Sequence, residues 1–226
     1  MDDLPFRVAW STIIEIGPVK FSQLLSVFGN PEQAWKSPDR EVEKFGWGEV
    51  TGRILQARKR INPQKEYEKC LKNKVTLLVP EDETYPKLLK EIHDPPFLLY
   101  IRGEFLPQDN VSLTVVGSRK MTSYGAQVIE SLVPQLVNSG LSIVSGLALG
   151  VDGQATEVAY RSGGRIISVL ASGVDKPTPY TNAQLALRIV AEGKGAIVSE
   201  FPMGTDPQPF YFPRRDRLVS GLSLGT

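Results

Sequence analysis

Residues 111–226 alternate between short apolar segments and longer segments in which apolar residues recur at helical spacing. Four segments have the length and the β-branched composition of buried strands: 113–116, 141–144, 165–170 and 196–199. The predicted helices between and after them are 123–139, 151–161, 182–192 and 214–222. Strands that alternate with helices of this length form a parallel sheet with helices on both faces. The pattern therefore predicts an α/β fold for this part of the chain.

Residues 7–60 show a different pattern, in which short helical segments are separated by glycine and proline. The predicted helices are 8–15, 19–28, 31–35, 39–45 and 49–60. Two further apolar segments, 75–79 and 97–101, are predicted strands that pair with the edge of the following sheet. We therefore expect two domains, a small all-α domain at 1–74 and an α/β domain at 75–226.

Each predicted strand of the α/β part ends in polar or glycine-rich residues. These ends are Gly117-Ser118-Arg119-Lys120, Ser145-Gly146, Ala171-Ser172-Gly173 and Ser199-Glu200. In an open parallel sheet, ligands bind outside the carboxyl ends of the strands. The sequence therefore predicts a binding site along this edge, which we call the rim.

The turn 145–152 joins the second predicted strand to a helix and contains Gly146 and Gly150. Glycines let a ligand approach the backbone closely, and a helix N-terminus favours an anion. The alternative interpretation is a strand-to-helix turn in which the glycines serve only the backbone. The spacing matches neither G-x-G-x-x-G nor a P-loop, so no nucleotide cofactor is expected.

The composition excludes several kinds of site. The net charge of +1 means that a polyanion must be held by a local cluster or by backbone amides. One histidine, His93, and one cysteine, Cys70, are too few for a zinc site or a Ser-His-Asp triad, so neither a metal nor catalysis is expected. The unpaired cysteine, the lack of a long apolar segment and the lack of a secretory signal predict a cytoplasmic protein without a membrane span.

Two turns of the helical part, 16–20 and 45–48, look like helix-hairpin-helix turns, which offer backbone amides to DNA phosphate. The alternative is that these turns only pack helices together. Residues 51–74 hold eight Lys or Arg residues against two Glu residues. Such a segment is either a solvated helix face or an accessory nucleic-acid surface.

Several motifs occur in a characteristic order between residues 75 and 226. They are Tyr85-Pro86, Asp94-Pro95-Pro96, Leu99-Tyr100, Val116-Gly117-Ser118-Arg119, the turn 145–152, Gly163-Gly164, the segment 199–204 and the segment 212–217. With this set the chain resembles the DNA-processing protein A (DprA/Smf) family. The N-terminal helical part matches that family more loosely.

The resemblance implies an extended Rossmann-like domain, preceded by a helical domain of the sterile-α-motif or helix-hairpin-helix type. It implies a protein without catalysis that binds single-stranded DNA and protects incoming DNA. It also implies a homodimer that loads the RecA recombinase during natural transformation. The chain ends at Thr226, where relatives continue with further strands, so the resemblance predicts either a fragment or a shortened member.

The chain departs from the family pattern at three places. Thr156 stands where the family usually has histidine, and Asp216 stands where it usually has asparagine. The segment Asn182-Ala183-Gln184 lacks the basic residue that relatives often carry near this asparagine. Each change is expected to weaken DNA binding.

The resemblance assigns the phosphate site to residues at the strand ends and in the last helix. These are Gly117, Ser118, Arg119, Lys120, Ser145, Gly146, Gly150, Asp152, Gly173, Arg214, Arg215 and Arg217. Arg119 is the principal candidate, because its planar guanidinium follows a strand end. Tyr124, Tyr211 and Phe212 are candidates for stacking on bases, with a core position as the alternative for Phe212.

Two other functions remain open at this point. A nucleotide-processing hydrolase of the related phosphoribohydrolase type would need a carboxylate on the rim, and only Asp152 and Glu200 stand there. We expect Asp152 to cap its helix and Glu200 to hold an arginine. The other possibility is a protein-interaction module, for which the sequence has no recognisable motif.

Overall fold

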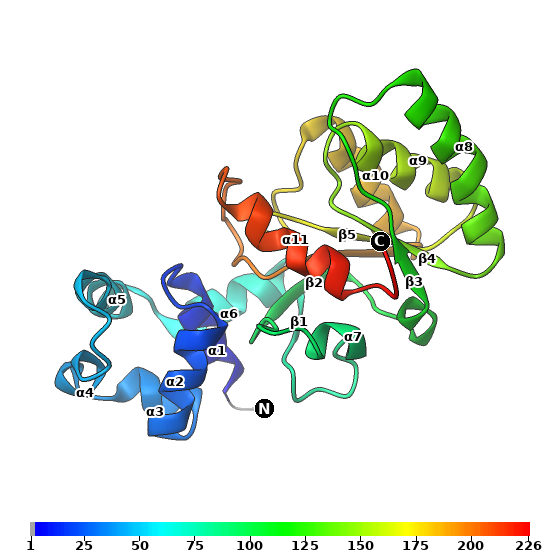
Figure 1. Cartoon of the computed structure of the whole chain (residues 1–226). Helices are drawn as coiled ribbons and strands as arrows, with labels where there is room; N and C mark the ends of the chain where they lie inside the picture. The colour runs from blue at the N-terminus through cyan, green and yellow to red at the C-terminus, as the bar shows by residue number, and fades with distance from the viewer. Residues whose placement is uncertain (1–2) are drawn as a thin grey trace.

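A computed structural model describes residues 3–226 of the chain, which begins with helices packed around one another (Figure 1). These are α1 (Leu4–Thr12), α2 (Pro18–Phe28), α3 (Pro31–Lys36), α4 (Asp39–Glu43), α5 (Glu49–Arg60) and α6 (Pro63–Lys72). The predicted proline and glycine punctuation is confirmed, because Pro18 and Pro31 occupy the first positions of α2 and α3. Helix α6 lies within the basic segment 51–74.

The rest of the described chain is built on one sheet. Its strands are β1 (Thr76–Leu78), β2 (Leu99–Gly103), β3 (Ser112–Thr114), β4 (Ser142–Ser145), β5 (Ile166–Val169) and β6 (Gly195–Ser199), in the order β1-β2-β6-β5-β4-β3. Strands β3 to β6 are parallel, as predicted. Strands β1 and β2 add to the β6 edge in antiparallel orientation, so the sheet is mixed. The connecting elements are α7 (Lys87–Lys90), the 3-10 helix η1 (Pro107–Asn110), α8 (Ser123–Asn138), α9 (Val151–Arg161), α10 (Tyr180–Ala191) and α11 (Tyr211–Gly221).

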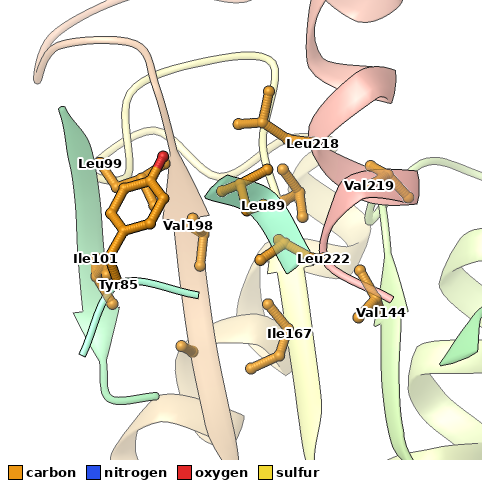
Figure 2. Close-up of a cluster of buried hydrophobic side chains, with 12 residues drawn as sticks. Tyr85, Leu89, Leu99, Ile101, Val144, Ile167, Val198, Leu218, Val219 and Leu222 are labelled. Atoms are coloured by element: carbon orange, nitrogen blue, oxygen red, sulfur yellow. The ribbon is translucent and has the colours of Figure 1, made fainter. Parts of the chain in front are cut away.

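Helices cover both faces of the sheet, which confirms the predicted α/β class. On one face, α11 packs over the parallel strands through Leu218, Val219 and Leu222 (Figure 2). On the other face, α8, α9 and α10 pack against alternate residues of the same strands, such as Ile143 and Ile166. Neighbouring residues of a strand point to opposite faces, so each strand contributes apolar side chains to both layers. The helices cover the faces of the sheet, and the carboxyl ends of the strands form the rim.

The helical part has its own core and also contacts the antiparallel edge of the sheet. Trp10 lies at the centre of this core, where its indole Nε1 donates a hydrogen bond of 3.1 Å to the carbonyl oxygen of Pro31. Phe21 of α2 stacks on Phe97 with 3.9 Å between ring centroids. The hydroxyl of Ser11 lies 2.5 Å from that of Tyr100 in β2. A division into domains at residues 74 and 75 stays a prediction.

The predicted segments differ from the observed elements mainly at their ends. Helices α5 and α9 have the predicted bounds, whereas α1 begins four residues earlier than predicted and α11 three residues earlier. The predicted strands 75–79 and 97–101 are confirmed as β1 and β2, including their pairing with the sheet edge. Among residues 3–226, no helix is both long enough and apolar enough to cross a bilayer.

Candidate nucleic-acid interface

The loops that follow β3 and β4 meet at the rim. The amide of Val151 at the start of α9 donates a hydrogen bond of 3.2 Å to the carbonyl oxygen of Ser118. Gly150 makes this approach possible, because its φ is +77° and a Cβ there would overlap the same carbonyl oxygen. Gly117 is also constrained, since a Cβ would lie 2.8 Å from Cγ2 of Val151. The glycines of both loops are therefore needed for the loops to pack against each other.

Asp152 connects the two loops from within the first turn of α9. Its carboxylate accepts hydrogen bonds from the amide of Gly146 at 3.1 Å and from the amide of Gly117 at 3.3 Å. Burial raises the pKa of Asp152, against the opposing effects of the Gly117 amide and the charge of Arg215. The prediction that Asp152 caps its helix is wrong: the N-cap is Gly150, and Asp152 is bonded to amides that precede the helix.

Arg215 lies inside the protein behind the loop after β4. Its side chain is buried, and its Nη1 donates to the carbonyl oxygens of Gly146 at 2.7 Å and Val169 at 2.5 Å. A Cβ on residue 146 would come within 2.6 Å of the guanidinium. Gly146 is therefore required by Arg215. Because both oxygens are backbone atoms at strand ends, Arg215 holds the rim together. A phosphate contact by Arg215 stays a prediction.

Arg214 and Arg217 are held by Glu200, which follows β6. Arg214 Nε lies 3.1 Å from the Glu200 carboxylate, Arg217 donates to the other carboxylate oxygen, and Arg217 also pairs with Asp94 at 3.3 Å. Burial raises the pKa of Glu200, and the charges of Arg214 and Arg217 oppose that shift. The prediction that Glu200 holds an arginine is confirmed. These ion pairs compensate the charges of Arg214 and Arg217, which the sequence assigned to phosphate.

Arg119 differs from the arginines of α11 because it is exposed and, within residues 3–226, forms no ion pair. Its guanidinium carbon lies 4.7 Å from the centroid of the Phe212 ring. Lys120 beside it is also exposed, and its amide donates to the hydroxyl of Ser118 at 3.1 Å. The Gly117–Lys120 turn therefore presents two cations to solvent at the end of β3.

A cleft of about 250 Å³ opens beside this turn. Predicted site residues line it together with residues of α11: Gly117, Arg119, Ala148, Asp152, Phe212, Arg215, Asp216 and Ser220. The structure thus brings the residues after β3, the residues after β4 and the start of α11 to one place. Arg119 and Phe212 are the residues of this cleft that combine a free cation with an aromatic face.

Ser145 and Gly173 are among the predicted site residues that do not line the cleft. Ser145 is buried, and its hydroxyl donates to the carbonyl oxygen of Val115 at 2.8 Å. Gly173 follows β5 and is buried, and its amide donates a hydrogen bond of 3.0 Å to the carbonyl oxygen of Thr205. Both residues therefore support loops and are not exposed to a ligand.

The three departures from the family pattern have structural roles. Thr156 is buried and donates from its hydroxyl to the carbonyl oxygen of Asp152 at 2.8 Å. Asn182 donates to the carbonyl oxygens of Leu147 and Ala148, at 2.9 and 3.0 Å, so it supports the loop after β4. Asp216 is exposed and pairs with Arg215 at 3.0 Å.

The structure changes the set of aromatic candidates. Tyr124 is exposed, as a stacking residue must be, whereas Tyr211 is buried and Phe212 is half-buried beneath Arg119. Tyr180 and Phe210 are exposed at the starts of α10 and α11 and were not predicted. The predicted helices begin later, at residues 182 and 214, so the sequence pattern did not place these two rings at helix starts. In the part of the chain that the structure describes, no three His, Cys, Asp or Glu residues are grouped to hold a metal.

The chain is similar to proteins of one family. A profile of the family described as DNA recombination-mediator protein A matches residues 76–226. The chain is 37% identical to the protein Smf of Synechocystis over 96% of this chain and 56% of that protein. It is 39% identical to the DNA processing protein DprA of Bacillus subtilis over 62% of this chain and 47% of that one. The chain thus spans about half the length of these relatives.

Two solved structures are similar as well. The X-ray structure of DNA processing protein A from Streptococcus pneumoniae has a TM-score of 0.75 at 28% identity, over 96% of this chain and 74% of that one. The second structure is DNA processing protein A from Helicobacter pylori, described for its single-stranded DNA binding mode. It has a TM-score of 0.57 at 31% identity, over 66% of this chain and 66% of that one. By the family match and the similarity to these proteins, the chain belongs to the DNA recombination-mediator protein A family.

Proposed function

We propose that the protein binds single-stranded DNA at the rim, with Arg119 as the principal side-chain contact to phosphate. The observation that carries this proposal is the exposed guanidinium of Arg119, which has no acidic partner in residues 3–226 and lies on Phe212 at the mouth of the cleft. A planar guanidinium offers a fork of donors to a phosphate group. The relative from Helicobacter pylori, described for its single-stranded DNA binding mode, supports the same ligand.

The charges of the rim favour a small number of phosphate contacts. Glu200 compensates the charges of Arg214 and Arg217, and Arg215 is buried. Among residues 3–226, Arg119 and Lys120 are therefore the exposed cations without an ion pair next to the cleft. The net charge of +1 supplies no general attraction for a polyanion. Affinity must therefore depend strongly on Arg119.

The protein acts without catalysis in this proposal. The rim carboxylates are Asp152 and Glu200, both buried, and each is already engaged, the first by amides and the second by arginines. A general base needs a carboxylate that reaches a reacting atom, so neither fits a phosphoribohydrolase. We further propose that the protein protects incoming DNA and loads RecA on it in natural transformation, in the cytoplasm and as a homodimer. Family membership supports these roles.

The direct test of the proposed ligand is equilibrium binding of a fluorescent oligothymidine, with unlabelled single strand and unlabelled duplex as competitors. We expect the single strand to compete and the duplex to compete much more weakly. Arg119→Ala should bind the oligonucleotide about tenfold more weakly, which is the range of one charge-assisted contact. Equal competition by duplex would contradict the proposal, as would unchanged affinity of Arg119→Ala.

The further roles need two separate assays. RecA filament formation on single-stranded DNA should be faster with the protein than without it, and Arg119→Ala should remove the increase. Turnover of a nucleoside monophosphate that survives purification and is lost in Glu200→Gln would instead support the hydrolase alternative.

A further inference from the structure

The exposed aromatic residues in the described part of this protein are few, and each stands at the start of a helix. The sequence has three Trp, seven Tyr and nine Phe residues, all within the described residues 3–226. Among them, only Tyr124, Tyr180 and Phe210 are exposed, at 74%, 80% and 65%. Each stands at the beginning of a helix that follows a parallel strand: Tyr124 in α8, Tyr180 in α10 and Phe210 at the N-cap of α11.

All three residues stand in or just after the connections that leave the carboxyl ends of the parallel strands. Phe210 follows β6, Tyr180 follows β5 and Tyr124 follows β3, and these strands lie in the order β6-β5-β4-β3. The strand between them, β4, is followed by Leu149, which is also exposed. Neighbouring strands lie about 4.8 Å apart, so the ends of β6 and β3 are separated by roughly 15 Å. Arg119 follows β3, and Phe212, two residues after Phe210, lies against its guanidinium in the cleft, so the start of α11 reaches the β3 end of the rim.

Phe210 has a rigid support beneath it. Its ring meets the buried Tyr211 edge-on, with 4.4 Å between centroids, and Tyr211 in turn packs on the buried Phe201 at 4.4 Å. An aromatic cluster thus runs from the interior to the surface and ends in an exposed ring. Burial cannot account for that outer ring, because it remains 65% exposed.

The arrangement of the rings indicates the kind of ligand. The exposed rings come from three different helices, and glycine- and serine-rich loops lie between them. A protein partner would be expected to cover a contiguous apolar area. Separate rings next to a phosphate site instead suit successive unpaired bases, because each base stacks on one aromatic face.

We propose, on the basis of the single-stranded DNA function inferred above, that Phe210, Tyr180 and Tyr124 are base-stacking residues. Arg119 contacts the phosphate backbone beside Phe212, and the three rings hold unpaired bases of the same strand. Stacking does not depend on base identity but requires bases free of a duplex. These residues therefore favour single-stranded DNA over duplex DNA, whereas Arg119 binds the phosphates of both.

The test separates bases from backbone with two probes of equal length. One is an oligothymidine, and the other is an abasic oligonucleotide with the same phosphates and no bases. The variants are Phe210→Ala, Tyr180→Ala and their double variant, with Phe210→Trp and Tyr180→Phe as replacements that keep a ring. Val27→Ala, an apolar residue of α2 that is 61% exposed, is the matched control. Circular dichroism of each variant checks the fold.

We expect the wild type to bind oligothymidine more tightly than the abasic probe. Each alanine variant should bind oligothymidine roughly 5- to 150-fold more weakly, with no change for the abasic probe. The ring-keeping variants and Val27→Ala should bind as the wild type does, and Arg119→Ala should lose affinity for both probes.

Three results would contradict the inference in distinguishable ways. Wild-type affinity of the folded double variant for oligothymidine would exclude stacking on Phe210 and Tyr180 while leaving the phosphate site intact. Equal wild-type affinity for both probes would exclude any base contact. Failure of the wild type to bind either probe would overturn the proposed function together with this inference.

Discussion

The guanidinium of Arg119 lies over the ring of Phe212, 4.7 Å from its centroid. Arg119 belongs to the loop after β3, and Phe212 belongs to the first turn of α11, so the contact joins two elements on opposite sides of the cleft. Phe212 is itself held by the buried Phe201 and Tyr211. The ring therefore positions the cation while leaving its donors free for a phosphate.

Phe212→Leu should weaken binding of oligothymidine about two- to fivefold, because a cation–π contact at an exposed site contributes about 0.5–1 kcal/mol. Leucine keeps most of the apolar packing. In the Arg119→Ala background the same substitution should have no further effect. The double-variant cycle measures this, with Phe105→Leu as a control at a half-buried ring outside the cleft. Additive losses would show that Phe212 acts independently of Arg119.

Asp152→Asn should lower the free energy of unfolding by about 1–3 kcal/mol. The amide group of asparagine can accept from only one of the two amides, of Gly117 and Gly146, and meets the other with a donor. Urea denaturation measures the change. Asp216→Asn, an exposed aspartate of the same cleft, is the control and should change stability by less than about 0.5 kcal/mol. Equal effects of the two substitutions would contradict the role of Asp152.

Gly150→Ala should destabilise the protein more than Gly46→Ala does. Both glycines have positive φ, +77° and +66°, so each substitution carries the cost of about 1–2 kcal/mol for a left-handed residue. At Gly46 a Cβ would have nothing within 4 Å, whereas at Gly150 it would overlap the carbonyl oxygen of Ser118. Thermal melting of both variants gives the comparison. A similar shift for both would mean that the two rim loops do not depend on their close packing.

The pH dependence of stability should include a contribution from Cys70. Burial, and next the charge of Glu66, raises the pKa of the buried Cys70 thiol from 9.0 to about 11. The unfolded chain therefore loses this proton first, so the thiol's contribution to stability is complete below about pH 9 and is lost as the pH rises towards 11. Cys70→Ala should show a smaller decline than the wild type in urea unfolding at pH 8, 9 and 10. Identical declines would contradict the raised pKa.

Much of the fold could be predicted because the pattern of apolar residues follows directly from burial. Segment 165–170, for example, is apolar because β5 lies between two helical layers. The antiparallel orientation of β1 and β2 could not be predicted in this way, since periodicity carries no strand direction. Periodicity does not define helix ends precisely either: α11 begins at Tyr211, three residues before the predicted start at residue 214.

The site was less predictable, since side chains of one type have different roles there. Arg119 and Arg215 have the same guanidinium group, but the first is exposed and the second is buried against the carbonyl oxygens of Gly146 and Val169. These contacts join residues far apart in the chain, so spacing gives no indication of them. The same holds for Glu200, whose partners lie in α11.

The central claim is that one exposed arginine at the end of β3 carries the main phosphate contact. The most direct measurement is the affinity for oligothymidine as a function of salt concentration, for the wild type, Arg119→Ala and the control Arg53→Ala, whose exposed arginine pairs with Glu15 in the helical part. We expect Arg119→Ala to reduce the magnitude of the slope of log K against log salt by about 0.7, the value for one phosphate of a single strand. Lys120→Ala should reduce it by less. An unchanged slope and affinity in a folded Arg119→Ala protein would contradict the account and would place the phosphate contacts elsewhere, with the basic segment 51–74 as the next candidate.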